Sequence, residues 1–131
     1  MATGGQVVGE ALANEGTKIL FTLCGGHILP IYEGCLDQGI RVVDVRHEQA
    51  AAFAADAWAR VTGDVGVAAV TAGPGVCNSL TAIVNARNSD SPILVLGGQA
   101  ETRRRGQGAL QETPHVRILE PVTKWARSCP S

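Results

Sequence analysis

The stretch Arg46-His-Glu-Gln-Ala-Ala-Ala-Phe-Ala-Ala-Asp-Ala-Trp-Ala-Arg60 largely determines the predicted fold, because it converts an apolar strand over residues 40–45 into a helix. Apolar side chains recur in it at helical spacing, and they form one face made of Ala50, Phe53, Ala54, Ala57, Trp58 and Val61. Glu48 lies in the first turn, away from that face and close to the end of the strand. Ligands of open α/β sheets bind at the carboxyl ends of strands, so Glu48 stands where a ligand is expected.

Glu48 has two interpretations from this stretch alone. An acidic residue in the first turn stabilises a helix through the helix dipole, by a few tenths to about 1 kcal/mol. Alternatively, Glu48 is a buried carboxylate that hydrogen-bonds a ligand. The remainder of the sequence has to decide between them.

Strands and helices alternate along the rest of the chain. We expect helices over residues 4–16, 28–38, 76–87 and 115–119, strands over 18–23, 65–70 and 92–96, and a possible edge segment at 122–125. Residues 65–70 are apolar without alternation, as in a strand covered on both faces. The pattern predicts a single α/β domain over residues 1–131, with an open parallel sheet and helices on both faces. Because aromatic residues make up only 4% and alanine and glycine are frequent, the helices should lie close to the sheet.

Composition and charge argue against several classes of function. The net charge is −1, and the only basic run, Arg103–Arg105, is expected in a solvated loop, so a nucleic-acid partner is not indicated. The longest apolar run, residues 65–72, is too short to span a bilayer. The four cysteines form no C-x-x-C pair and lie at no metal-ligand spacing from a histidine, so no metal site is predicted. We expect reduced thiols in a cytoplasmic protein.

Four turns should meet at one edge of the sheet, because each either follows a strand or lies next to a turn that follows a strand. They are Gly25–His27, His47–Glu48, Gly73–Gly75 with Asn78, and the loop through Gln111. The two glycine-rich turns lack both common phosphate-binding patterns, and their bare backbone better suits a flat ring. The sequence contains no G-x-S-x-G elbow, so a hydrolase with that motif is not indicated. Of the strand-end histidines, His27 is the better functional candidate, whereas His47 is expected to bond locally.

Six segments carry a family pattern: Phe21-Thr-Leu-Cys-Gly-Gly-His-Ile-Leu-Pro-Ile-Tyr32, Arg46-His-Glu-Gln49, Ala54-Ala-Asp-Ala-Trp-Ala-Arg60, Thr71-Ala-Gly-Pro-Gly-Val-Cys-Asn78, Ser91-Pro-Ile-Leu-Val-Leu-Gly-Gly98 and Gly106-Gln-Gly-Ala-Leu-Gln-Glu112. In this order and spacing they resemble the N-terminal, pyrimidine-binding domain of thiamine-diphosphate enzymes. The resemblance is closest to the acetolactate synthase group, including 2-hydroxyacyl-CoA lyases, and covers nearly the whole chain.

The resemblance implies a role for each candidate residue. Glu48 matches the glutamate that hydrogen-bonds N1′ of the cofactor's aminopyrimidine and favours the tautomer that takes the proton from the thiazolium carbon. Gly73, Pro74 and Asn78 match the turn that packs on the pyrimidine. The substrate side is implied for Gly26, His27, Leu110 and Gln111. The resemblance therefore favours the ligand interpretation of Glu48.

The resemblance also implies parts that this sequence does not contain. Enzymes of the family hold magnesium and the diphosphate on another domain with a Gly-Asp-Gly…Asn motif, which is not found here. We therefore expect the chain to bind only the pyrimidine half of thiamine diphosphate and to need a diphosphate-binding domain or subunit in a homo- or hetero-oligomer. Use of FAD stays open, since that site lies in the family's central domain. Compared with the family pattern, we also expect the last helix and strand of the domain to be missing, and the resulting open sheet edge favours a partner.

The expected reaction is decarboxylation of a 2-oxo acid with carboligation, or the reverse cleavage of a carbon–carbon bond. The substrate class is a small 2-oxo acid, an aldehyde or an acyl-CoA, and the chain is expected to be inactive alone. The alternative is a non-catalytic domain that keeps the fold for dimerisation or regulation.

Overall fold

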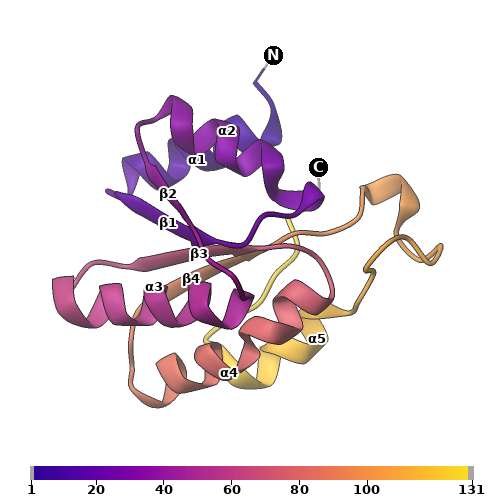
Figure 1. Ribbon diagram of the computed structural model, residues 1–131. Coiled ribbons are helices and arrows are strands. Elements are labelled where there is room, and N and C mark those ends of the chain that lie inside the picture. Colours follow the sequence, from indigo (N-terminus) through magenta and orange to yellow (C-terminus); the bar gives the residue numbers. More distant parts are fainter. Residues whose placement is uncertain (1, 130–131) are drawn as a thin grey trace.

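The computed structural model describes residues 2–129 and contains a four-stranded parallel sheet in the order β2-β1-β3-β4 (Figure 1). The strands are β1 Ile19–Thr22, β2 Arg41–Asp44, β3 Gly66–Val70 and β4 Ile93–Gly97. The helices are α1 Gly4–Asn14, α2 Leu29–Asp37, α3 Glu48–Thr62, α4 Pro74–Asn88 and α5 His115–Leu119, with short 3-10 turns η1 Gly26–Ile28, η2 Thr102–Arg104 and η3 Glu120–Val122. The predicted α/β class with a parallel sheet is confirmed. None of the described helices has the length and apolar character needed to cross a membrane.

Helices cover both faces of the sheet, as predicted. Figure 1 shows α1 and α2 on one face and α3 and α4 on the other. Leu20 and Val67 join the core beneath α1 and α2, whereas their strand neighbours Phe21 and Ala68 join the core beneath α3. Every residue of β3 is buried, which agrees with the continuous apolar run in that strand.

Helix α3 buries a different face from the predicted one. Its buried residues are Glu48, Ala51, Ala52, Ala55, Asp56 and Ala59. In the predicted face, by contrast, Phe53 is 36% exposed and Val61 is 85% exposed. Spacing alone did not distinguish the two faces, because alanines supply apolar positions all around this helix.

The size of the contacting residues decides which face of α3 is buried. A Cβ atom at Gly66 of β3 would overlap the carbonyl oxygen of Ala55, so helix and strand meet backbone to backbone. Only small side chains fit a contact this close, and cores tolerate overpacking poorly. Phe53 and Val61 turn toward solvent, whereas the half-buried Trp58 packs over Phe21 of β1 with the ring centroids 6.4 Å apart. The expectation of close packing on the sheet is confirmed, although it acts through the other face.

A hydrogen-bond network around the buried Asp56 joins α3 to α4, and it includes the Asp56–Arg60 ion pair within α3. The Asp56 carboxylate, 3% exposed, accepts hydrogen bonds from Arg60 Nε at 2.8 Å and Nη2 at 2.9 Å, and from Asn85 Nδ2 at 2.8 Å. The hydrogen bonds from Arg60 hold the pKa of Asp56 below its ordinary value despite burial. This network fixes the rotation of α3, the helix whose first turn carries Glu48.

The predicted edge segment at 122–125 is not a strand. Val122 ends η3, and residues 125–129 have no regular structure. Pro121 lies in η3 and lacks the N–H that a sheet ladder needs, and Trp125 is 66% exposed. Strand β4 is consequently the last strand of the sheet within the described residues.

The contact of α3 with β3 can be tested with a matched pair of substitutions. Ala55→Leu is expected to lower the free energy of unfolding by about 2 kcal/mol or more, because the site cannot admit extra methyl groups. Ala57→Leu, two residues away on the exposed face, is expected to change it by less than about 0.5 kcal/mol. Urea denaturation followed by circular dichroism measures both. Equal losses from the two variants would contradict the observed rotation of α3.

Candidate functional site

Side chains from several separate segments meet at the carboxyl ends of the strands. Glu48 is the first residue of α3 and is only 8% exposed. His47 caps this helix, since its Nδ1 accepts a hydrogen bond from the Gln49 amide at 3.2 Å. The prediction that His47 bonds locally is therefore confirmed, and Glu48 points into the protein rather than into solvent.

The Glu48 carboxylate is held by the predicted neighbour Asn78. Asn78 Nδ2, in the second turn of α4, donates to Glu48 Oε2 at 2.9 Å across 30 residues of sequence. Among residues 2–129, no hydrogen bond reaches the other oxygen, Oε1, which keeps contact with solvent. Gly75 leaves room beside it, because a Cβ there would lie 3.5 Å from Oε1. One carboxylate oxygen is thus fixed, and the other is available.

A second group centres on Thr71, which directly follows β3. Its hydroxyl lies 3.1 Å from His27 Nδ1 and donates to Gln111 Oε1 at 3.4 Å. If the one hydrogen of that hydroxyl points to Gln111, we expect His27 to donate from Nδ1, and its neutral ring then presents Nε2 as an acceptor. The structure therefore brings together His27 and Gln111, two predicted substrate-side residues, through a residue that sequence reasoning did not select.

The glycines of this edge make room for the chain itself. A Cβ at Gly25 or at Gly75 would collide with the side chain of Thr71, and one at Gly73 would collide with the Gln111 backbone. Gly26 differs, since it is exposed and a Cβ there would have no neighbour within 4 Å. Close packing within the site, rather than an approaching ring alone, therefore accounts for three of these glycines.

The remaining predicted residues lie on the outer surface of the site. Pro74 and Asn78 are exposed at the start of α4, and Leu110 is 77% exposed at the tip of its loop. Gln111 is half-buried with φ +59°, a conformation that is uncommon for a residue with a side chain. The structure joins Glu48 with Asn78 and His27 with Gln111, whereas Leu110 stands apart in solvent.

His115 is a second residue that sequence reasoning missed. Its Nε2 accepts a hydrogen bond from the Gly73 amide at 2.8 Å, although 42 residues separate the two. Burial lowers the pKa of His115, and the nearby His27 lowers it further. The sequence offered one signal for His115 as a site residue: it directly follows Pro114 and lies four residues after Gln111, a predicted site residue.

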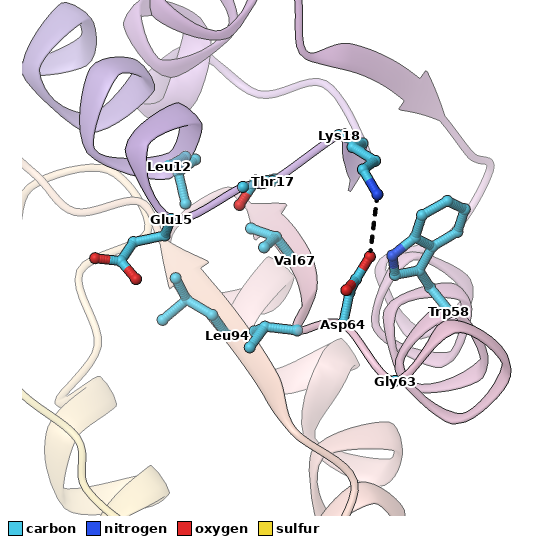
Figure 2. Close-up of a pocket in the computed structure, with 11 residues that line it drawn as sticks. Leu12, Glu15, Thr17, Lys18, Trp58, Gly63, Asp64, Val67 and Leu94 are labelled. Carbon is cyan, nitrogen blue, oxygen red and sulfur yellow. Dashed lines mark hydrogen bonds and ion pairs between the residues drawn. The ribbon is translucent and has the colours of Figure 1, made fainter.

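Two hollows lie away from the Glu48 carboxylate. One, of about 640 Å³, opens at the amino ends of β1 and β3. Figure 2 shows it between Leu12, Trp58 and the Lys18–Asp64 ion pair, and none of the predicted site residues lines it. The other is a cleft of about 790 Å³ between β4, α5 and the C-terminal segment, which His115 borders. Within the described residues, no group of three metal-binding side chains is found.

The chain is similar to known proteins over nearly its whole length. The family model described as the thiamine pyrophosphate enzyme N-terminal TPP binding domain matches residues 2–118. A 2-hydroxyacyl-CoA lyase 2 of Danio rerio is 52% identical over 125 residues, which are 95% of this chain and 20% of that protein. The acetolactate synthase large subunit of Mycobacterium tuberculosis is 47% identical over 127 residues, 97% of this chain and 23% of that protein. The chain thus spans about a fifth of the length of the curated relatives that it matches.

The Thr71 network can be tested by removing its hydroxyl. Thr71→Val keeps the shape of the side chain but is expected to release His27, whose imidazole should then populate both neutral tautomers. The measurement is nitrogen-15 NMR of the histidine side chains near pH 8, where the wild type should show His27 protonated at Nδ1. Thr71→Ser restores the hydroxyl and should restore the single tautomer. A wild-type imidazole protonated at Nε2 would contradict the assignment.

Proposed function

We propose, since this chain belongs to the family of thiamine pyrophosphate enzyme N-terminal TPP-binding domains, that it supplies the pyrimidine-binding half of an acetolactate-synthase-like or 2-hydroxyacyl-CoA-lyase-like enzyme. The observation that carries the proposal is the buried Glu48 carboxylate, which Asn78 fixes at Oε2 and which accepts no hydrogen bond at Oε1 from the described residues. The reaction class is decarboxylation of a 2-oxo acid with carboligation, or cleavage of a carbon–carbon bond next to a carbonyl. The substrate class is a small 2-oxo acid, an aldehyde or an acyl-CoA.

The residues at this edge fit an aminopyrimidine. Glu48 Oε1 is open to solvent and accepts no hydrogen bond among the described residues, so a ring nitrogen that carries a proton could donate to it. Pro74 offers an exposed apolar ring at the start of α4, one turn before Asn78. Gly73, Pro74 and Asn78 would therefore border the ring, while Glu48 would bond its edge.

When bound, the thiazolium of thiamine diphosphate supplies an electron sink for the carbon–carbon bond that is made or broken. Glu48 Oε1 would accept a hydrogen bond from N1′, and a carboxylate would strengthen that bond if positive charge developed on the ring. Asn78 prevents the carboxylate from rotating away. His27, whose Nδ1 lies 3.1 Å from the Thr71 hydroxyl, would present Nε2 to the substrate side.

The outer face of α3 supports a partner for this half-site. Ala50, Phe53, Ala57 and Val61 form an exposed apolar stripe on the helix that begins with Glu48. Such a stripe is typical of a surface that another protein covers. The proposed partner is the domain or subunit that holds magnesium and the diphosphate, within a homo- or hetero-oligomer.

The role of Glu48 predicts a large effect of a one-atom change. Glu48→Gln is expected to lower kcat of the enzyme reconstituted with its diphosphate-binding partner by about 10²- to 10⁴-fold, since an amide cannot strengthen the bond to a ring that becomes cationic. Glu10→Gln, on the exposed surface of α1, is the matched control and should leave kcat unchanged. Full activity of Glu48→Gln would remove Glu48 from the mechanism and favour a dimerisation or regulatory role for the chain.

The isolated chain is expected to bind thiamine diphosphate more weakly than about 1 μM, and to show no synthase or lyase activity, because the charged half of the cofactor would be held by the partner. Isothermal titration calorimetry with magnesium present measures the affinity before and after the partner is added. Micromolar binding by the chain alone would overturn this division of the site.

A further inference from the structure

His115 connects the two loops that flank the Glu48 site. It begins α5, directly after the segment that carries Leu110 and Gln111, and its imidazole reaches back to the turn that begins α4. The acceptor is Nε2 and the donor is the Gly73 amide, 2.8 Å away. Gly73 has φ +60° and ψ −108°, and no side chain caps α4 at this position. The imidazole therefore satisfies a backbone donor at a turn that only glycine adopts readily.

The same segment contacts Gly73 a second time. The Gln111 backbone lies so close to Gly73 that a Cβ atom there would overlap its carbonyl oxygen. His115 and Gln111 thus hold the turn together, one by a hydrogen bond and the other by packing. Two further contacts extend from this clamp to the site, because Thr71 bonds Gln111 and Asn78, one turn into α4, bonds Glu48.

The direction of the hydrogen bond fixes the protonation state of His115. An amide can only donate, so Nε2 must carry a lone pair and the ring must be neutral with its proton on Nδ1. A protonated imidazole has no acceptor and would place an N–H against the Gly73 N–H. The charged or titratable side chains around it favour the neutral ring: His27 faces it from η1, and Arg105, Arg117, Lys124 and Arg127 border the same cleft. Among the described residues that line this cleft, none is a carboxylate.

We propose that His115 is a positioning residue whose neutral imidazole clamps the Leu110–Gln111 loop onto the Gly73–Pro74 turn, and that protonation of the imidazole opens this clamp. This inference rests on the proposed function in one respect: the Gly73–Pro74 turn is taken as the cofactor side of the site, and the Leu110–Gln111 loop as the substrate side. Acidification would separate these two sides of the site without altering Glu48 or Asn78 themselves.

The test uses NMR of the labelled chain without any cofactor, so its outcome is independent of the proposed function. In the wild type, His115 should be protonated at Nδ1 and should titrate below the ordinary histidine pKa of about 6.5. The amide signals of Gly73 and Gln111 should shift in the same pH transition. A ring protonated at Nε2 near neutral pH, or a Gly73 signal that ignores the titration of His115, would overturn the proposal.

Variants separate the hydrogen bond from general packing. His115→Gln offers a carbonyl acceptor that does not titrate, so Gly73 should keep its slow hydrogen exchange and lose the pH transition. His115→Leu removes the acceptor, and Gly73 exchange should become about tenfold faster, the effect of one lost hydrogen bond. If His115→Leu does not fold, the wild-type tautomer and His115→Gln still decide. His47→Gln is the control, because His47 also accepts a backbone N–H but lies on α3, and it should leave the Gly73 transition in place.

Discussion

The close contact between α3 and the central strand β3 is the constraint on which the site depends. Gly66 removes the side chain that would otherwise separate the strand from the Ala55 carbonyl, and alanines complete the rest of the contact. This contact sets the rotation of α3 and thereby turns Glu48 inward at the end of the sheet. From the α4 side, Asn85 holds the same rotation by its hydrogen bond to Asp56, which also pairs with Arg60 within α3. A polar side chain is thus buried where a ligand can reach it because small residues bring a helix close to a sheet.

Burial of Glu48 has a chemical consequence. A carboxylate in the exposed first turn of a helix would chiefly interact with the helix dipole, a modest and screened effect. Glu48 is instead 8% exposed, with Asn78 on one oxygen and none of the described residues bonding the other. In a site of low dielectric, a hydrogen bond to that oxygen is worth more than it would be in water. The proposed binding role of Glu48 thus depends on its depth in the protein, which its helical position alone does not determine.

The sequence predicted those features that depend on local pattern. Apolar runs identified the strands, the run over residues 65–70 identified the central one, and the strand-end turns identified Glu48, Asn78, His27 and Gln111 as neighbours. The buried face of α3 was predicted wrongly, because alanine spacing allows two faces and the choice depends on the absence of a side chain at Gly66. Thr71 and His115 escaped notice because their partners lie 40 or more residues away, and no local pattern reports such contacts. Prediction thus succeeded where periodicity decides and failed where size and distant hydrogen bonds decide.

The central claim is that Glu48 meets the aminopyrimidine of thiamine diphosphate. It is tested most directly by a crystal structure of the complete enzyme with cofactor and magnesium bound, in which the distance from the Glu48 carboxylate to N1′ is measured. The account predicts that Oε1 lies about 2.6–3.0 Å from N1′ while Oε2 keeps its bond to Asn78. A carboxylate more than about 4 Å from N1′, or a pyrimidine ring bound away from the Gly73–Pro74 turn, would contradict it.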